Sequence, residues 1–163
     1  MKKLPDISTL HSLFDYKDGN LVWKIQPSKI VKAGSIAGYK NQYGYIAVRI
    51  KRASYQAHRL IWAWHNRSIP SCLDHINGDR CDNRIENLRL ATYMENSHNR
   101  KTPKHNTSGF KGIYASKNKN KWIASIMFNS KRIYLGTFKD KNEAIKAYEK
   151  ASINLHKDFR KQI

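Results

Sequence analysis

The chain contains the stretch Leu73-Asp74-His75-Ile76-Asn77-Gly78-Asp79, and this stretch decides the fold of its central part. Its first four residues form a short run of the kind found in β-strands, and the Asn-Gly step is a strong signal for a tight turn. A polar loop follows at residues 80–86, and a second short apolar run occupies residues 88–91. Thr92 and Glu95 then have the spacing of a capping box, which predicts that a helix begins at the next residue after the threonine. The order strand, long loop, strand and helix is therefore predicted here.

Residues 1–57, which precede this region, contain several turn signals and one clear alternating run at residues 45–50. Alternation of apolar and other side chains is typical of a half-buried strand. From residue 58 to about residue 65 the apolar residues fall at helical spacing. We therefore predict short strands and turns, arranged as β-hairpins, followed by a helix.

The second half of the chain begins with residues 101–109, which are polar and basic and include Pro103, so we interpret them as a linker. Three strand candidates and a capped helix follow, and three antiparallel strands with one helix across them form the simplest closed arrangement. The predicted fold class is α+β. Its four parts are a β-rich region at 1–57, the strand–loop–strand–helix region at 58–100, the linker at 101–109, and a small sheet with one helix at 110–160.

The chain is strongly basic, with 31 Lys and Arg against 12 Asp and Glu and a formal net charge of +19. Such a charge favours a polyanionic partner, and nucleic acid is the leading candidate because each neutralised phosphate releases counterions. No basic amphipathic helix suggests a membrane surface. The longest apolar run, residues 60–64, is far shorter than the roughly 20 residues that span a bilayer. With no apolar secretion segment near the start, we expect a cytoplasmic protein. The expected partner is nucleic acid, and no small-molecule substrate is expected.

Cys72 and Cys81 are the two cysteines, and we interpret them as reduced, partly buried thiols. A structural zinc site needs about four ligands, usually in two close pairs. The set Cys72, His75, Cys81 and His98 fits no common spacing, so the sequence disfavours zinc.

Four polar residues of the central region suggest a different metal chemistry. Asp74 and His75 end the first strand, Asn87 starts the second, and Asn96 lies about one turn into the helix. A hard cation such as Mg²⁺ takes oxygen ligands and keeps several waters, so one carboxylate and one amide oxygen suffice to hold it. An imidazole beside it can deprotonate water. These residue types suit a phosphodiesterase with one divalent ion, Mg²⁺ or Mn²⁺.

The same residues carry a family resemblance. The runs 73–79, 82–89 and 95–99, together with His58-Arg59-Leu60-Ile61-Trp62 upstream, closely resemble an HNH endonuclease of the phage and group I intron homing type. The resemblance implies the ββα-metal motif of that family for residues 58–100. It also implies a bacterial or phage-infected cell as the setting and a mobile-element role.

Carried over by position, the resemblance assigns a role to each of the four residues. Asp74 and Asn96 are the metal ligands, His75 is the general base, and Asn87 orients His75 or braces the loop. The third letter of the motif is often histidine, and His98 lies two residues beyond Asn96, so His98 remains the alternative ligand. We favour Asn96, because hard cations prefer oxygen. His58 and Arg89 are further candidates for contact with DNA.

The C-terminal part resembles an APETALA2-type DNA-binding domain, through Phe110-Lys111-Gly112-Ile113, residues 121–124, residues 134–138 and the helix from residue 143. That family lays its three-stranded sheet in the major groove, with the helix behind. Trp122, Ala124 and Ile126 are then expected to face the helix. The residues expected to face DNA are Lys111, Tyr114, Ser125, Met127, Arg132 and Tyr134. Only one of these residues is an arginine, the residue type that commonly reads guanine. We therefore expect this domain to contribute affinity for DNA more than stringent recognition of bases.

The sequence as a whole predicts a monomeric, metal-dependent endonuclease that nicks duplex DNA. Two alternatives stay open: a DNA-binding regulator with a decayed nuclease domain, and an RNA-binding protein of ribosomal type, which would share the positive charge.

Overall fold

The computed structural model describes residues 4–98, 106–117, 120–156 and 159. The chain divides into two compact units, Met1–Thr92 and Tyr93–Ile163. The predicted mixture of helices and small antiparallel sheets is confirmed. The four-part division stays a prediction, and residues 101–105 of the expected linker lie outside the described residues. Within the described part of the chain, no helix is long and apolar enough to cross a membrane.

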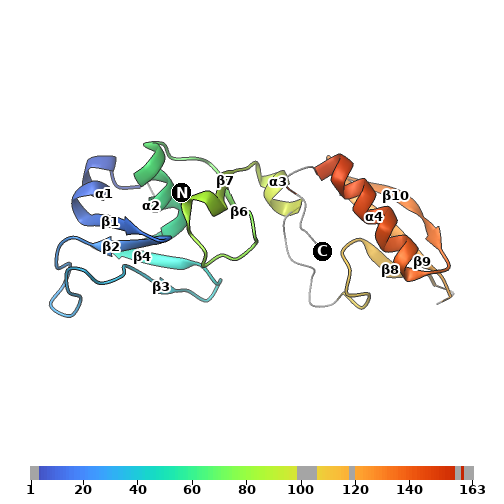
Figure 1. The fold of residues 1–163 in the computed structure, drawn as a ribbon, viewed down its shortest axis with the longest axis horizontal. Coiled ribbons are helices and arrows are strands. Elements are labelled where there is room, and N and C mark those ends of the chain that lie inside the picture. Colours follow the sequence, from blue (N-terminus) through green and yellow to red (C-terminus); the bar gives the residue numbers. More distant parts are fainter. Residues whose placement is uncertain (1–3, 99–105, 118–119, 157–158, 160–163) are drawn as a thin grey trace. The chain divides into compact units, whose positions relative to one another are not determined.

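The first unit consists of short antiparallel strand pairs around one central helix (Figure 1). Strands β1 and β2 form a hairpin, β3, β4 and β5 form a three-stranded sheet, and β6 pairs with β7. In chain order the elements are α1 (Ile7–Leu13), β1 (Phe14–Lys17), β2 (Asn20–Trp23), β3 (Tyr39–Lys40), β4 (Ile46–Ile50), β5 (Ala53–Gln56), α2 (Ala57–Asn66), β6 (Leu73–His75), the 3₁₀ turn η1 (Ile85–Asn87) and β7 (Leu88–Leu90).

Helix α1 corrects the expectation that residues 1–57 contain only strands and turns. The Asp6 side chain caps it by accepting a hydrogen bond from the Thr9 backbone N–H at 2.7 Å. The helix has only seven residues and buries a single one, Leu10. A helix this short shows little apolar periodicity, and its stability comes from packing against the core rather than from its own sequence.

The core of the first unit is built on α2. Leu60 and Ile61 have no exposed surface and pack with Phe14, Leu10 and Val48, which are equally buried. The indole Nε1 of Trp64 donates to the backbone carbonyl of Phe14 at 3.3 Å. These contacts join α2 to α1, to the β1–β2 hairpin and to the three-stranded sheet, so the helix forms a base next to β6.

The second unit contains a three-stranded antiparallel sheet in the order β10-β9-β8, and Figure 1 shows α4 lying across it. Ala124 and Ile126 of the central strand pack against Ala144 and Tyr148 of the helix. Gly112 must be glycine, because its φ is +74° and a Cβ there would overlap the Ser125 carbonyl oxygen and the Tyr148 ring. The elements are α3 (Tyr93–His98), β8 (Ile113–Ala115), β9 (Trp122–Phe128), β10 (Lys131–Phe138) and α4 (Lys141–His156).

Candidate active site

Asp74 and His75 lie next to each other on β6, the first strand of the central pair. The register pairs Asp74 with Arg89 and His75 with Leu88 on β7. Both side chains are nearly inaccessible to solvent, with 4% and 5% of their surface exposed. This three-residue strand, which ends at a tight turn, thus buries two adjacent polar groups, which need polar partners to be stable there.

The Arg89 guanidinium binds the Asp74 carboxylate. Its Nε and Nη2 both donate to Asp74 Oδ2, at 2.9 and 2.6 Å. The two side chains are only 16% and 5% exposed. Arg89 was expected to contact DNA, whereas in the structure its guanidinium pairs with a buried carboxylate. This position argues against a direct DNA contact for Arg89.

The imidazole of His75 is bordered by one amide and two aromatic rings. Its Nε2 lies 3.0 Å from Oδ1 of Asn83, whose side chain is only 3% exposed. The His58 ring stands edge-on to it at a centroid distance of 5.0 Å, and the Tyr45 ring lies 6.1 Å away. Asn83 was missed at the sequence level, where Asp82-Asn83 reads only as a turn.

Asn87 braces the loop between the two strands. Its Nδ2 donates to the Asn77 Oδ1 at 3.1 Å and to the Asp82 carbonyl at 2.7 Å, and its Oδ1 accepts from the Asn77 backbone N–H at 3.1 Å. Asn87 therefore ties the start of the loop to its far end. Of the two roles that the resemblance implies for Asn87, these contacts support loop bracing.

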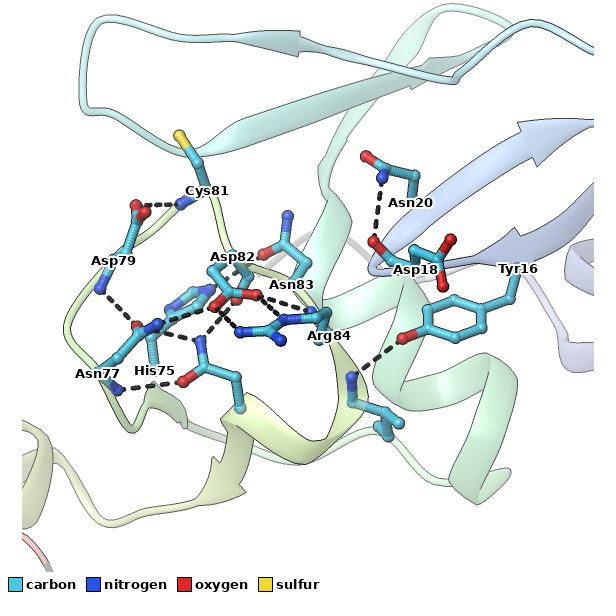
Figure 2. A network of polar contacts seen from close by, with 12 residues as sticks. Tyr16, Asp18, Asn20, His75, Asn77, Asp79, Cys81, Asp82, Asn83 and Arg84 are labelled. Carbon is cyan, nitrogen blue, oxygen red and sulfur yellow. Dashed lines mark hydrogen bonds and ion pairs between the residues drawn. The ribbon is translucent and has the colours of Figure 1, made fainter.

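The rest of the loop is held by charges and by the β3–β4 turn (Figure 2). The Asp82 carboxylate accepts two hydrogen bonds from the Arg84 guanidinium. These bonds, together with smaller contributions that include one from Asn77, lower the pKa of Asp82 to about 2. Arg80 donates to the Tyr43 carbonyl at 2.8 Å and lies over the Tyr45 ring, 4.8 Å from its centroid. These contacts brace the loop internally and tie it to the β3–β4 turn.

His58 sits beside the site rather than at its surface. It is 5% exposed, and its Nδ1 has no hydrogen-bond partner among the residues that the structure describes. Burial, with smaller effects from His75 and Arg59, lowers the pKa of His58 to about 3, so the ring is neutral at neutral pH. A buried neutral imidazole does not meet a DNA phosphate, and the structure argues against that expected contact.

Asn96, the other expected metal ligand, lies half-buried on α3, which belongs to the second unit. The side chain of the alternative ligand, His98, is outside the described part, so the choice between the two stays a prediction. In the described ranges, no group of three or more His, Cys, Asp or Glu side chains is arranged to hold a metal ion.

The residues expected to face DNA lie on one face of the C-terminal sheet. The register pairs Ser125 with Tyr134 and Met127 with Arg132, and directly paired residues point to the same side of a sheet. A hollow of about 520 Å³ opens beside them, lined by Lys111, Tyr114, Ser125, Met127 and Arg132 together with residues of α3 and α4. Ser125 is only 7% exposed, whereas Tyr134 is 63% exposed.

Comparison with known proteins identifies a domain in the part of the chain that contains β6, β7 and α3. Residues 55–98 match the HNH endonuclease family, so the chain carries an HNH endonuclease domain there. Over 77 residues the chain is 42% identical to protein 3.8 of Escherichia phage T7. The aligned segment covers 46% of this chain and 64% of the phage protein. Over 50 residues it is 48% identical to an AP2/ERF and B3 domain-containing transcription factor of Arabidopsis thaliana, covering 31% of this chain and 14% of the plant protein.

The matches thus span less than two thirds of the length of either relative. No solved structure matches the chain significantly. The expected HNH domain is confirmed, and the partial plant match gives weak support to the expected APETALA2-type resemblance.

Proposed function

We propose that this chain is a metal-dependent DNA endonuclease of the HNH homing type that hydrolyses phosphodiester bonds in duplex DNA, one strand at a time. The observation that carries the proposal is the buried Asp74–His75 pair on β6, within the segment that matches HNH endonucleases. Each member has a defined polar partner, the carboxylate in Arg89 and the imidazole in Asn83. Fixed geometry of this kind is what a general base needs.

His75 is the proposed general base. A neutral imidazole can take a proton from water and so produce the hydroxide that attacks phosphorus. The neighbouring His58 stays neutral because it is buried, so it adds no positive charge that would oppose proton uptake by His75. Asn87 holds the loop that carries Asn83 and thereby keeps the base in place.

The donor chemistry fits a divalent cation such as Mg²⁺ or Mn²⁺. Asp74 offers a carboxylate and Asn96 an amide oxygen, and hard cations prefer oxygen ligands. When bound, the ion would stabilise the negative charge that develops on the phosphate and the leaving 3′ oxygen. In the structure the Arg89 guanidinium binds Asp74 Oδ2, so a bound ion would share this carboxylate with the guanidinium.

The second unit is the proposed DNA-binding part, with the sheet face that bears Met127 and Arg132 toward the major groove. A net charge of +19 supports a nucleic-acid partner, and the partial match to an AP2-containing protein supports DNA. One set of catalytic residues in a monomer cuts one strand, so nicking is the expected product.

Incubation of supercoiled plasmid with the native chain and Mg²⁺ or Mn²⁺ tests the proposal. Conversion to open circles is expected, together with loss of nicking in His75→Ala and on addition of a chelator. His65→Ala is the matched control, because His65 is an exposed histidine on α2 of the same unit; this variant should nick like the native chain.

Two results would overturn the proposal in different ways. Tight binding of duplex DNA without nicking, across a range of metals and salt concentrations, would favour the DNA-binding regulator. Preference for structured RNA over duplex DNA at matched salt would favour the RNA-binding protein.

A further inference from the structure

We infer that Asn83 is a positioning residue that fixes the ring orientation and tautomer of His75. The functional consequence of this inference rests on the proposed nuclease activity, in which His75 is the base. The structural part of the inference does not depend on that activity.

The contact itself is short and buried. His75 Nε2 and Asn83 Oδ1 are 3.0 Å apart, and the two residues are 5% and 3% exposed. A polar pair so far from solvent exchanges little with water, and breaking it would leave buried polar atoms without a bond. Breaking the contact is therefore unfavourable in the folded state.

The chemistry of the two atoms decides the tautomer. An amide oxygen only accepts hydrogen bonds, so the ring nitrogen that faces it must carry the proton. In its neutral form His75 is then the Nε2–H tautomer, with the lone pair on Nδ1. A general base can act only through its lone pair, and Asn83 thus determines which side of the ring accepts a proton.

Asn83 can do this because the two loop residues before it are themselves held by hydrogen bonds. The preceding residue, Asp82, is bonded to Arg84 through its carboxylate and to Asn87 through its carbonyl. One residue earlier, the Cys81 thiol lies 3.3 Å from the Gly44 carbonyl oxygen on the β3–β4 turn. Figure 2 shows Asn83 emerging from this network next to His75. Other loop amides, such as that of Asn77, are engaged in bracing the loop instead.

Two aromatic neighbours of His75 restrict the orientation of its ring in addition to the Asn83 amide. The edge-on His58 ring and the Tyr45 ring limit where the imidazole plane can lie. Ring contacts have little directional preference for one nitrogen over the other, so they do not select a tautomer. Selection comes from the Asn83 amide.

The test is nitrogen NMR of the native full-length chain labelled with ¹⁵N-histidine, without DNA or metal. We expect His75 to show the Nε2–H tautomer in the native chain and in Asn83→Asp, which keeps the accepting oxygen. In Asn83→Leu, which keeps the approximate volume, we expect a mixture of tautomers. Asn66→Ala removes an exposed asparagine at the end of α2 and should leave the signal unchanged.

Nicking kinetics give the second measurement. Loss of an outer partner of a catalytic residue typically lowers the rate constant about ten- to a hundredfold, and we expect this for kcat in Asn83→Leu with KM for DNA unchanged. Partial recovery is expected in Asn83→Asp. An Nδ1–H tautomer in the native chain would overturn the inference, even if Asn83→Leu fails to fold. An unchanged tautomer in a folded Asn83→Leu would overturn it as well. The expected tautomers in a chain that never nicks would support the positioning role and reject the nuclease.

Discussion

Replacing Arg89 by alanine removes the partner of a buried carboxylate and keeps the carboxylate itself. Both guanidinium contacts with Asp74 Oδ2 are lost, and a carboxylate whose side chain is only 5% exposed loses this cation. Breaking one side of a buried ion pair costs about 3–5 kcal/mol, because the remaining buried charge loses its counterion.

Protonation of the carboxyl group sets an upper limit on that cost. At pH 7, about three pH units above the usual titration of aspartic acid, adding the proton costs about 4 kcal/mol. We therefore expect Arg89→Ala to lower the free energy of unfolding of the first unit by about 3–4 kcal/mol at pH 7. The limit falls by about 1.4 kcal/mol for each pH unit toward acid, so the loss should be clearly smaller at pH 5.

Urea unfolding at both pH values measures this loss. Arg84→Ala is the matched control, because Arg84 also binds an aspartate through its guanidinium but its side chain is 53% exposed. Exposed ion pairs contribute little to stability, so this control should change the midpoint only slightly. An equal loss in the two variants, or a loss in Arg89→Ala that is the same at pH 5 and pH 7, would refute the reasoning.

Three further predictions concern other parts of the chain. The pKa of His58 is lowered from 6.5 to about 3 by burial, so between these pH values the unfolded chain binds a proton at His58 that the folded chain does not. The contribution of the neutral His58 to stability is thus complete above pH 6.5 and declines by up to about 1.4 kcal/mol per pH unit below that. His58→Phe should remove this decline in a pH series of urea melts. An unaltered pH dependence in the variant would contradict the prediction. Gly112→Ala should cost the second unit about 2–5 kcal/mol through strain and overlap. Gly109→Ala, where φ is +77° and nothing lies within 4 Å, should cost only about 1 kcal/mol, and equal shifts in thermal melts would argue against overlap. Arg132→Ala should weaken duplex DNA binding and reduce the slope of log K against log salt by about 1, as measured by fluorescence anisotropy; an unaltered slope would rule out a phosphate contact.

Local sequence signals were enough to predict the order of elements in the central region. The Asn77-Gly78 turn and the Thr92 capping box act between residues a few positions apart, and the structure has β6, β7 and α3 where those signals predict them. The charge of the chain likewise depends on composition alone and indicates its kind of partner without any knowledge of the fold.

The environment of each polar side chain was decided by the tertiary structure. Arg89 looks like any basic residue until β6 and β7 pair and place it on Asp74. Asn83 is an ordinary turn residue until the loop docks on the β3–β4 turn and turns its amide toward His75. Burial and pairing depend on contacts between residues far apart in the chain, and the periodicity of a short segment contains no information about them.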